Sequence, residues 1–276
     1  MDKSNQLFAL PRPVIFAHRG ASRYAPEDTL AAFNLAVQQG ADAIELDAKL
    51  TADGQIVVFH DQTLERTTSA IGKIGKKTLS ELKGLDAGVH FDVSYQNEPI
   101  PTLEEVFEAV GQRTFINVEL TNYASPYDRL PEEVADLFKR HNLGCWVMTS
   151  SFNPVALFKI KRLLPGVPFG LLALEGRAGK WARSWIGSLI GYPALHPKFS
   201  DVDEKLVTRA HYYNRRVHPY TVNEAVVMQR LCDWDIDGIF TDDPPLARRI
   251  FSRDKSQITT TSHRHTQLDK YHYDPT

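Results

Sequence analysis

Short apolar runs alternate with amphipathic segments of helical period along almost the whole chain. Eight apolar runs have the length and composition of β-strands, at residues 14–18, 43–48, 115–120, 146–151, 169–174, 194–198, 216–222 and 237–242. The segments between them predict helices over 29–40, from 101 onward, and over 131–141, 153–164, 203–214, 223–234 and 244–251. This alternation is typical of a parallel α/β fold. Eight strands are the number that a closed (β/α)8 barrel, a TIM barrel, needs.

The length and composition of the chain fit one large barrel domain, which we expect over residues 1–251. The chain has 276 residues, of which 42% are hydrophobic and 24% charged, an ordinary globular composition. Residues 53–101 are too many and too irregular for one barrel crossover, and they predict an insertion over one end of the barrel. Residues 252–276 contain few apolar side chains and predict a flexible tail.

Charge and cysteine content exclude several kinds of partner. The formal net charge is only -2, so nothing indicates a nucleic-acid or anionic-membrane partner, and any cationic function must be local. No run approaches the ~20 apolar residues of a membrane span, and the N-terminus has no signal-peptide pattern. Cys145 and Cys232 lack metal-ligand spacing and indicate free thiols in a reducing compartment. We expect a cytoplasmic protein with no integral membrane association.

Acidic side chains stand at the ends of two predicted strands. Glu45 and Asp47 are two positions apart on one strand and so point to the same face, and Glu119 ends the next barrel strand. Three carboxylates meeting at the barrel mouth suit a hard divalent cation, Mg²⁺ or Ca²⁺, because every ligand is oxygen. The alternative is structural, with each acid paired to an arginine.

Two histidines and an arginine complete a possible phosphate site. His18 ends the first strand, Arg19 follows it, and His60 ends the segment after the second strand. Cleavage of a phosphodiester needs one group that accepts a proton, another that donates one, and positive charge on the phosphoryl oxygens. Two imidazoles, a guanidinium and a metal supply these parts. A lone His18 would equally fit a satisfied core histidine.

These segments resemble the glycerophosphodiester phosphodiesterase family. The resemblance covers about residues 13–251 and rests on HRGASRYAPEDTLAAF, IELDAKLTADGQIVVFHD, LDAG, IPTLEEVF, INVEL, SSFNP, YTVN and DGIFTDDP. It implies a (β/α)8 barrel with a small insertion between the second and third barrel strands. It also implies hydrolysis of glycerophosphodiesters to sn-glycerol 3-phosphate and an alcohol.

The resemblance also assigns roles to individual residues. By carry-over of its motifs, His18 and His60 are the general acid/base pair, and Arg19 contacts the phosphate. One divalent cation is held by Glu45, Asp47 and Glu119. Glu27 lines the site and orients Arg19, and Tyr220 forms an aromatic wall beside the glycerol.

The sequence departs from the family pattern at two positions. Asp28 stands where relatives usually carry asparagine, a change that is local if it only caps a helix. Thr121 stands where many relatives carry a lysine near the phosphate. Lys198, at the end of the sixth strand, is the candidate replacement, and a solvent-exposed lysine is the alternative.

Two other functions stay open. An apolar stripe at Trp181, Trp185, Ile186, Leu189 and Ile190 is either the buried face of a barrel helix or an apolar lid that receives an acyl chain. A lid would favour contact with lysophospholipids and a lysophospholipase D-like activity. The third hypothesis is a non-catalytic barrel that binds phosphate esters, but the chain keeps both histidines and all three acids.

Overall fold

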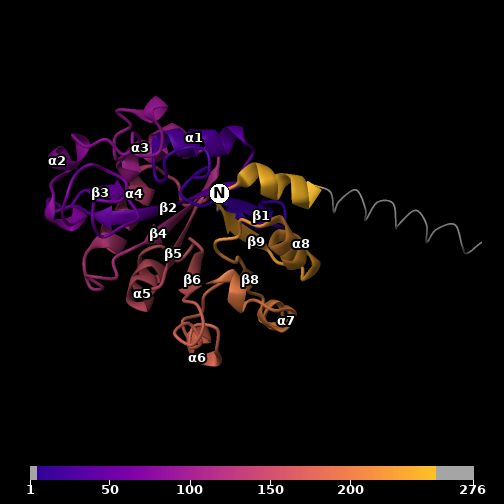
Figure 1. Ribbon diagram of the computed structural model, residues 1–276. Coiled ribbons are helices and arrows are strands. Elements are labelled where there is room, and N and C mark those ends of the chain that lie inside the picture. The colour runs from indigo at the N-terminus through magenta and orange to yellow at the C-terminus, as the bar shows by residue number, and fades with distance from the viewer. Residues whose placement is uncertain (1–4, 253–276) are drawn as a thin grey trace, which may run out of the picture.

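The computed structural model describes residues 5–252 and shows a parallel barrel (Figure 1). All eight predicted barrel strands are present, and they lie side by side in the order β8, β7, β6, β5, β4, β2, β1, β9. They are β1 (Val14–Ala17), β2 (Ala43–Leu50), β4 (Phe115–Leu120), β5 (Val147–Ser151), β6 (Phe169–Ala173), β7 (Ala194–Pro197), β8 (Arg216–Val217) and β9 (Gly238–Thr241). The predicted fold class is confirmed.

Backbone hydrogen bonds between the two end strands close the barrel. The Asp237 amide donates to the Val217 carbonyl at 3.1 Å, and the Phe240 amide donates to the Pro219 carbonyl at 2.9 Å. The strand β8 is shorter than the predicted run over 216–222, although the Tyr220 amide still donates to the Pro197 carbonyl at 3.0 Å.

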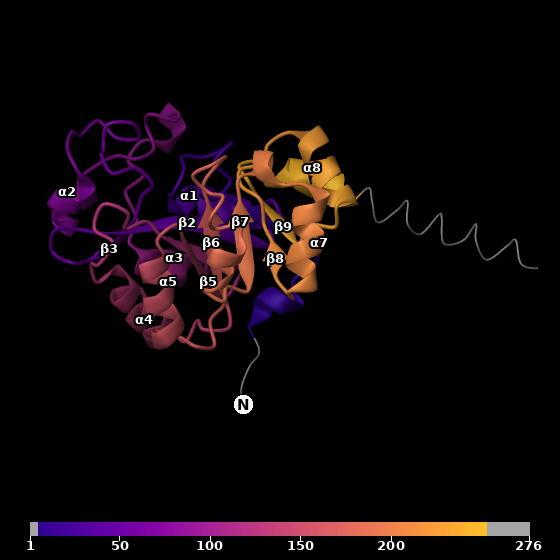
Figure 2. The ribbon, with the colours of Figure 1, turned by 90° about the horizontal axis from the view of Figure 1, so that it is seen from below.

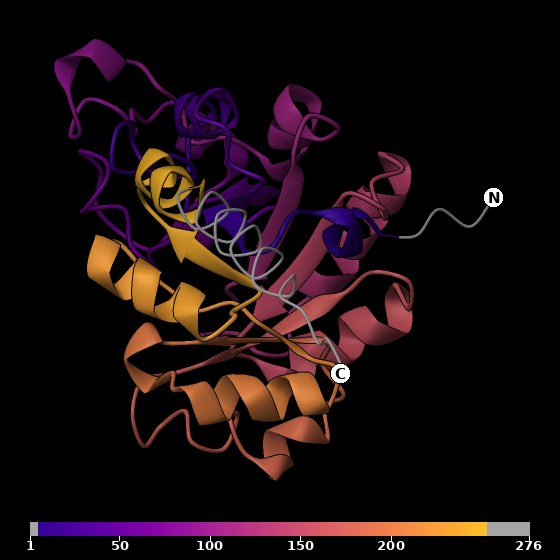
Figure 3. The same cartoon turned by 90° about the vertical axis from the view of Figure 1, so that its right-hand side faces the viewer.

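Helices cover the outside of the barrel, as Figures 1 and 3 show. They are α1 (Leu30–Gln38), α3 (Leu103–Val110), α4 (Leu130–Arg140), α5 (Pro154–Leu163), α7 (Glu204–Tyr212), α8 (Ala225–Asp233) and a last helix at 244–252. Thr102 and Glu105 form a capping box at the start of α3. Within residues 5–252 no helix has the length and apolar character needed to cross a membrane.

The insertion extends to one side of the barrel, at the left of Figures 1 and 2. It contains β3 (Ile56–Val58), η2 (Ile74–Lys76), α2 (Leu79–Lys83) and η3 (Val93–Tyr95). β3 pairs antiparallel with the far end of β2, and the insertion has its own apolar cluster, which includes Phe59, Leu64 and Leu82. His60 therefore sits on a stable element beside the barrel.

A short turn closes the amino-terminal end of the barrel. The 3-10 helix η1 (Gln6–Ala9) lies below the strands in Figure 2. Its Leu7 is buried in a cluster with Phe16, Phe115 and Phe240, and the Asn5 side chain donates to the Val147 carbonyl at 2.9 Å. The predicted tail lies outside the described residues except for Ser252.

The segment 181–190 matches neither sequence expectation. Only one helical turn forms there, α6 (Trp185–Ser188), followed after β7 by the 3-10 helix η4 (Phe199–Asp201). Ile190 is buried, but Trp185 and Leu189 are exposed, so the stripe is not the buried face of a barrel helix. Trp181 and Trp185 also do not line the cavity at the barrel mouth, because the chain leaves the mouth before it reaches them.

Candidate active site

One cavity of about 400 Å³ opens at the carboxyl ends of the barrel strands. It gathers eight of the nine residues that the sequence singled out, and Glu27 lies behind its wall against Arg19. The eight lining residues are His18, Arg19, Glu45, Asp47, His60, Glu119, Lys198 and Tyr220. Residues from five barrel strands or their following loops and from the insertion meet here, as is usual for a barrel of this kind.

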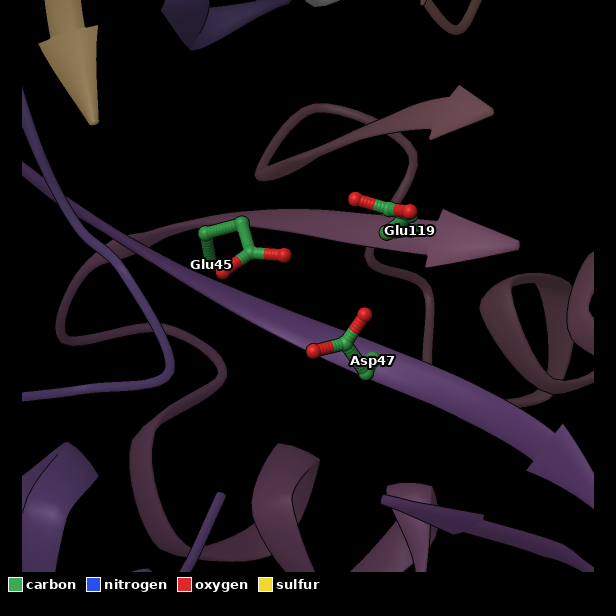
Figure 4. A group of neighbouring side chains, drawn as sticks. All are labelled: Glu45, Asp47 and Glu119. Carbon is green, nitrogen blue, oxygen red and sulfur yellow. The ribbon is translucent and has the colours of Figure 1, made fainter. Parts of the chain in front are cut away.

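Three carboxylates line this cavity, and Figure 4 shows their side chains on the neighbouring strands β2 and β4. Asp47 on β2 is the register partner of Glu119 on β4, and Glu45 lies two positions earlier on β2. One oxygen atom from each carboxylate lies within 4.8 Å of the others. Glu45 and Asp47 are almost fully buried. The strand geometry therefore produces the predicted acid cluster.

The acid cluster carries more negative charge than its neighbours neutralise. Burial, followed by repulsion from Asp47, raises the pKa of Glu119 to about 8 and also raises the pKa of Glu45. Arg19 Nε lies 3.3 Å from Asp47 Oδ2, but that buried oxygen accepts no hydrogen bond. Arg19 and the buried Lys49 are two cations beside the three acids and the buried Asp28, so negative charge remains in excess. The all-oxygen cluster therefore fits a divalent cation better than a structural ion pair.

A tight turn after β1 places Arg19 in the cavity. Arg19 and Gly20 have φ angles of 55° and 81°, and a Cβ atom on Gly20 would lie 2.7 Å from Ala32. Glycine is therefore required at position 20. The turn aims the Arg19 amide at Glu45 Oε2, at 3.0 Å, so the same loop orients an acid and the guanidinium.

A chain of ion pairs joins Arg19 to the insertion. Glu27 accepts from Arg19 Nη1 at 2.9 Å and from both terminal nitrogens of Arg66 at 2.7 Å. Arg66 also pairs with Asp61, whose carboxylate lies 2.6 Å from His60 Nδ1. Glu27 therefore orients Arg19 as expected from its position, and Arg66 is a participant that the sequence reasoning missed. Nothing in its local sequence marks it.

Each histidine of the cavity has a carboxylate on Nδ1. His60 pairs with Asp61, and His18 Nδ1 lies 2.7 Å from Asp242 Oδ1. Asp242 also accepts from Ser22 and Asn223. Although burial raises the pKa of Asp242, these hydrogen bonds bring it to about 2. Sequence reasoning gave Asp242 no role, but its place at the end of the last strand was the available signal.

The Nδ1 partners fix which nitrogen of each ring is free. A carboxylate beside Nδ1 favours the tautomer with the hydrogen on that atom, which leaves the Nε2 lone pair available. Burial, followed by the charge of Arg19, lowers the pKa of His18. His18 is therefore uncharged at neutral pH and able to accept a proton.

A family comparison agrees with this geometry. Residues 18–246 match the model of the glycerophosphoryl diester phosphodiesterase family. The chain belongs to this family. The family prediction from the sequence, and with it the prediction of an enzyme, is confirmed.

Curated relatives of this phosphodiesterase family and solved structures support the assignment. The chain is 38% identical to a glycerophosphodiester phosphodiesterase of Caldanaerobacter subterraneus over 84% of its length and 95% of the relative. It is 31% identical to one from Bacillus subtilis, over 88% of each chain. An Oleispira antarctica phosphodiesterase, solved with the product sn-glycerol-3-phosphate, has a TM-score of 0.81 at 32% identity, covering 89% of this chain and 99% of that one.

Thr121, where the resemblance implies a lysine, contacts a lysine from another strand, and neither residue lines the active-site cavity. Lys49 on β2 is buried, and its amine donates to Thr121 Oγ1 at 2.6 Å. The residue lies on the same face of β2 as Glu45 and Asp47, at the next alternate position. The alternate spacing of residues 45, 47 and 49 was the sequence signal that could have predicted this contact.

The other expected contacts of the phosphodiesterase form the cavity wall. The Tyr220 hydroxyl donates to the Ala173 carbonyl at 2.9 Å, and its ring meets Phe152 edge to face at 6.0 Å. Lys198 lies 5.8 Å from the Tyr220 ring centroid. The expectation that Asp28 only caps a helix is wrong, because Thr29 is the N-cap of α1. Asp28 is buried and accepts from the Asp47 amide, so its effect reaches the acid cluster.

Proposed function

We propose that this chain is a metal-dependent phosphodiesterase that hydrolyses glycerophosphodiesters to sn-glycerol 3-phosphate and an alcohol. The observation that carries the proposal is the meeting, in one cavity, of two carboxylate-paired histidines, an arginine and three clustered acids. The Oleispira relative bound to sn-glycerol-3-phosphate supports the choice of substrate class.

Glu45, Asp47 and Glu119 would hold one divalent cation, Mg²⁺ or Ca²⁺. Their buried oxygen donors, the unbonded Asp47 Oδ2 atom and the raised carboxyl pKa values all fit this ligand. When bound, a cation of this kind lowers the pKa of a nearby hydroxyl and offsets negative charge on phosphoryl oxygens. The proton transfers and the direct contacts with the phosphate are made by the side chains around the cluster.

The two histidines divide the proton transfers. One takes a proton at Nε2 from the attacking hydroxyl, which is either water or the 2-hydroxyl of the substrate glycerol. The other gives a proton to the oxygen of the departing alcohol. Attack by water gives sn-glycerol 3-phosphate directly, whereas attack by the 2-hydroxyl gives a cyclic phosphate that a water molecule then opens with the proton transfers reversed. Either route consumes one water and releases no net proton from the pair. Arg19 donates to the phosphoryl oxygens as charge develops on them. Phe152 and Tyr220 bound the space for the glycerol.

Asp242→Asn is expected to lower kcat by about 10²-fold or more, because an amide at position 242 no longer favours the His18 tautomer with a free Nε2. The acid limb of the kcat/KM pH profile should also move to lower pH, since Asp242 raises the pKa of His18. Ser22→Ala, which removes one hydroxyl donor to Asp242, is the milder control. An unchanged profile in Asp242→Asn would exclude a positioning role.

Lys49→Met is expected to raise KM about 10-fold and to lower the concentration of cation needed for half-maximal activity. Lys49 interacts electrostatically with Asp47 and Glu119, so its loss weakens attraction for phosphate and strengthens attraction for the cation. Thr121→Lys in the same variant should restore KM. Lys76→Met, on an exposed part of the insertion, is the control, and equal kinetics in both single variants would contradict the idea.

Release of sn-glycerol 3-phosphate from a panel of substrates tests the proposed function. We expect release from glycerophosphocholine, glycerophosphoethanolamine and glycerophosphoglycerol, its loss with a chelator, and its return with Mg²⁺ or Ca²⁺. Lysophosphatidylcholine is the decisive comparison. Turnover of this lipid alone would favour a lysophospholipase D-like enzyme, and no turnover of any diester would favour a non-catalytic barrel.

A further inference from the structure

The connection between β6 and β7 leaves large apolar side chains uncovered on the outer wall of the barrel. Trp185 and Leu189 are each 73% exposed, and Trp181 and Ile186 are exposed beside them. We call these four residues the α6 patch. Figure 1 shows α6 at the periphery, beyond the strands. Contiguous exposed apolar side chains of this kind mark an interaction surface.

The local packing prevents the α6 patch from turning inward. Gly187 lies against the buried Ala182, and a Cβ atom at position 187 would come within 2.3 Å of the Ala182 carbonyl oxygen. The inner face of the turn is therefore already in close contact with the protein. Trp185 and Leu189 are four positions apart and share the outer face.

The surroundings of the α6 patch are cationic. Residues 174–192 contain Arg177, Lys180 and Arg183 and one acid, Glu175, which accepts from Ser200 Oγ at 2.8 Å. Arg183 is neutralised by Asp201 at 2.9 Å. Arg177 and Lys180 are exposed and form no ion pair with any residue in 5–252. The apolar side chains are thus flanked by free positive charge, although the whole chain is nearly neutral.

A groove of about 400 Å³ continues the cationic surface between α6 and α7. Trp185 lines one side of it, and Arg209 and Arg215 line the other. Arg215 stacks 4.6 Å from the centroid of the Tyr192 ring and donates to Ser188 Oγ at 2.6 Å. Neither arginine pairs with a carboxylate among the described residues. An anionic group in the groove would find two guanidinium groups with unused donors.

We propose that the α6 patch docks on the surface of an anionic phospholipid bilayer. Trp185 and Leu189 enter the boundary between head groups and acyl chains, Arg177 and Lys180 lie over the anionic head groups, and a lipid phosphate occupies the groove at Arg209. Tryptophan, leucine and basic residues on one face are the combination that binds bilayer interfaces.

Charge favours a bilayer over a second copy of the chain. A symmetric dimer would bring the α6 patch against itself, so that Arg177 and Lys180 of both copies would repel across an apolar contact. An anionic bilayer complements the same charges. The proposal goes beyond the proposed function and does not depend on it. The connection begins at Leu174 on the cavity rim, so docking would hold the rim beside a source of phosphodiester head groups.

Co-sedimentation of the full chain with vesicles tests the docking. We expect binding to vesicles of equal parts phosphatidylglycerol and phosphatidylcholine, little binding to phosphatidylcholine alone, and weaker binding at high salt. The double variants Trp185→Ser with Leu189→Ser, and Arg177→Glu with Lys180→Glu, should each bind at least about 10-fold more weakly, consistent with the interfacial contribution of apolar and basic groups.

Tyr127→Ser is the matched control, because Tyr127 is 77% exposed and lies on the connection between β4 and α4. It should bind vesicles as the unmodified chain does, and all variants should keep their turnover of glycerophosphocholine. Equal vesicle binding by every variant, or no preference for anionic vesicles, would overturn the proposal. A dimer that dissociates in Trp185→Ser with Leu189→Ser, without vesicle binding, would assign the α6 patch to a second copy.

Discussion

His18→Asn and His60→Asn are each expected to lower kcat by about 10²–10⁴-fold, the range usual for loss of a general acid or base. Each asparagine keeps a polar side chain of similar width but cannot exchange a proton near neutral pH. The effect should fall mainly on kcat, because Arg19 and the cation that the acid cluster would hold still bind the phosphate. Initial rates of sn-glycerol 3-phosphate release measure it.

His141→Asn is the control for the histidine variants. His141 also pairs with a carboxylate, Glu104 Oε1 at 2.9 Å, and its side chain is 23% exposed against 18% for His18. It lies outside the cavity, and its replacement should leave kcat unchanged. The double variant His18→Asn with His60→Asn should lose less activity than the product of the two single losses, because both residues act in one step. Full activity in the double variant would refute the assignment.

Glu119→Gln is expected to remove activity and to stabilise the metal-free protein at the same time. Replacement of a residue that only hydrogen-bonds to a metal ligand lowers metal affinity or activity by about 10–100-fold. Replacement of a ligand itself should therefore lower activity by at least about 10²-fold. The stability should move in the opposite direction, because the glutamine removes one of three mutually repelling acids.

The pH dependence of this stabilisation has a definite sign. The pKa of Glu119 is about 8 in the folded metal-free protein and close to 4.3 in an unfolded chain. The unfolded state therefore loses its proton first, and the stability of the metal-free protein falls as pH rises from about 4.3 to about 8. Glu119→Gln removes this loss. Its melting temperature should exceed that of the unmodified protein at pH 8 and match it near pH 4.5.

Thermal unfolding with and without a divalent cation checks this prediction. For a chain of this size, each kcal/mol added to the free energy of unfolding raises Tm by about 2–4 °C. Cation should raise the Tm of the unmodified protein more at pH 8 than at pH 6 and should have little effect on Glu119→Gln. Glu175→Gln, an exposed acid on the cavity rim, should respond as the unmodified protein does. A metal-free Glu119→Gln that melts lower at pH 8 would contradict the repulsive cluster.

The sequence was sufficient for the barrel and for the acid cluster, because both follow from local periodicity. Strand alternation puts Glu45 and Asp47 on one face, and parallel register sets Asp47 opposite Glu119. The same rule would have placed Lys49 beside them. Lys198 alone was predicted as the replacement for a lysine at position 121.

The remaining contacts depend on chain segments far apart in sequence. Asp242 reaches His18 across 224 positions, and Arg66 reaches Glu27 across 39. No periodicity encodes such pairs. The prediction for the 181–190 segment failed for a different reason. Its apolar residues recur with helical spacing, but only one helical turn forms there. Gly187 and Gly191 limit the turn, the latter with a positive φ of 70°.

The central claim is hydrolysis of a glycerophosphodiester at this cavity, and ³¹P NMR of glycerophosphocholine turnover in ¹⁸O-labelled water tests it most directly. We expect the phosphodiester signal to be replaced by that of sn-glycerol 3-phosphate with one ¹⁸O on phosphorus and unlabelled choline, and we expect a chelator or His60→Asn to stop the change. A phosphodiester signal that stays unchanged with added Mg²⁺ and Ca²⁺, or label found in choline, would contradict it.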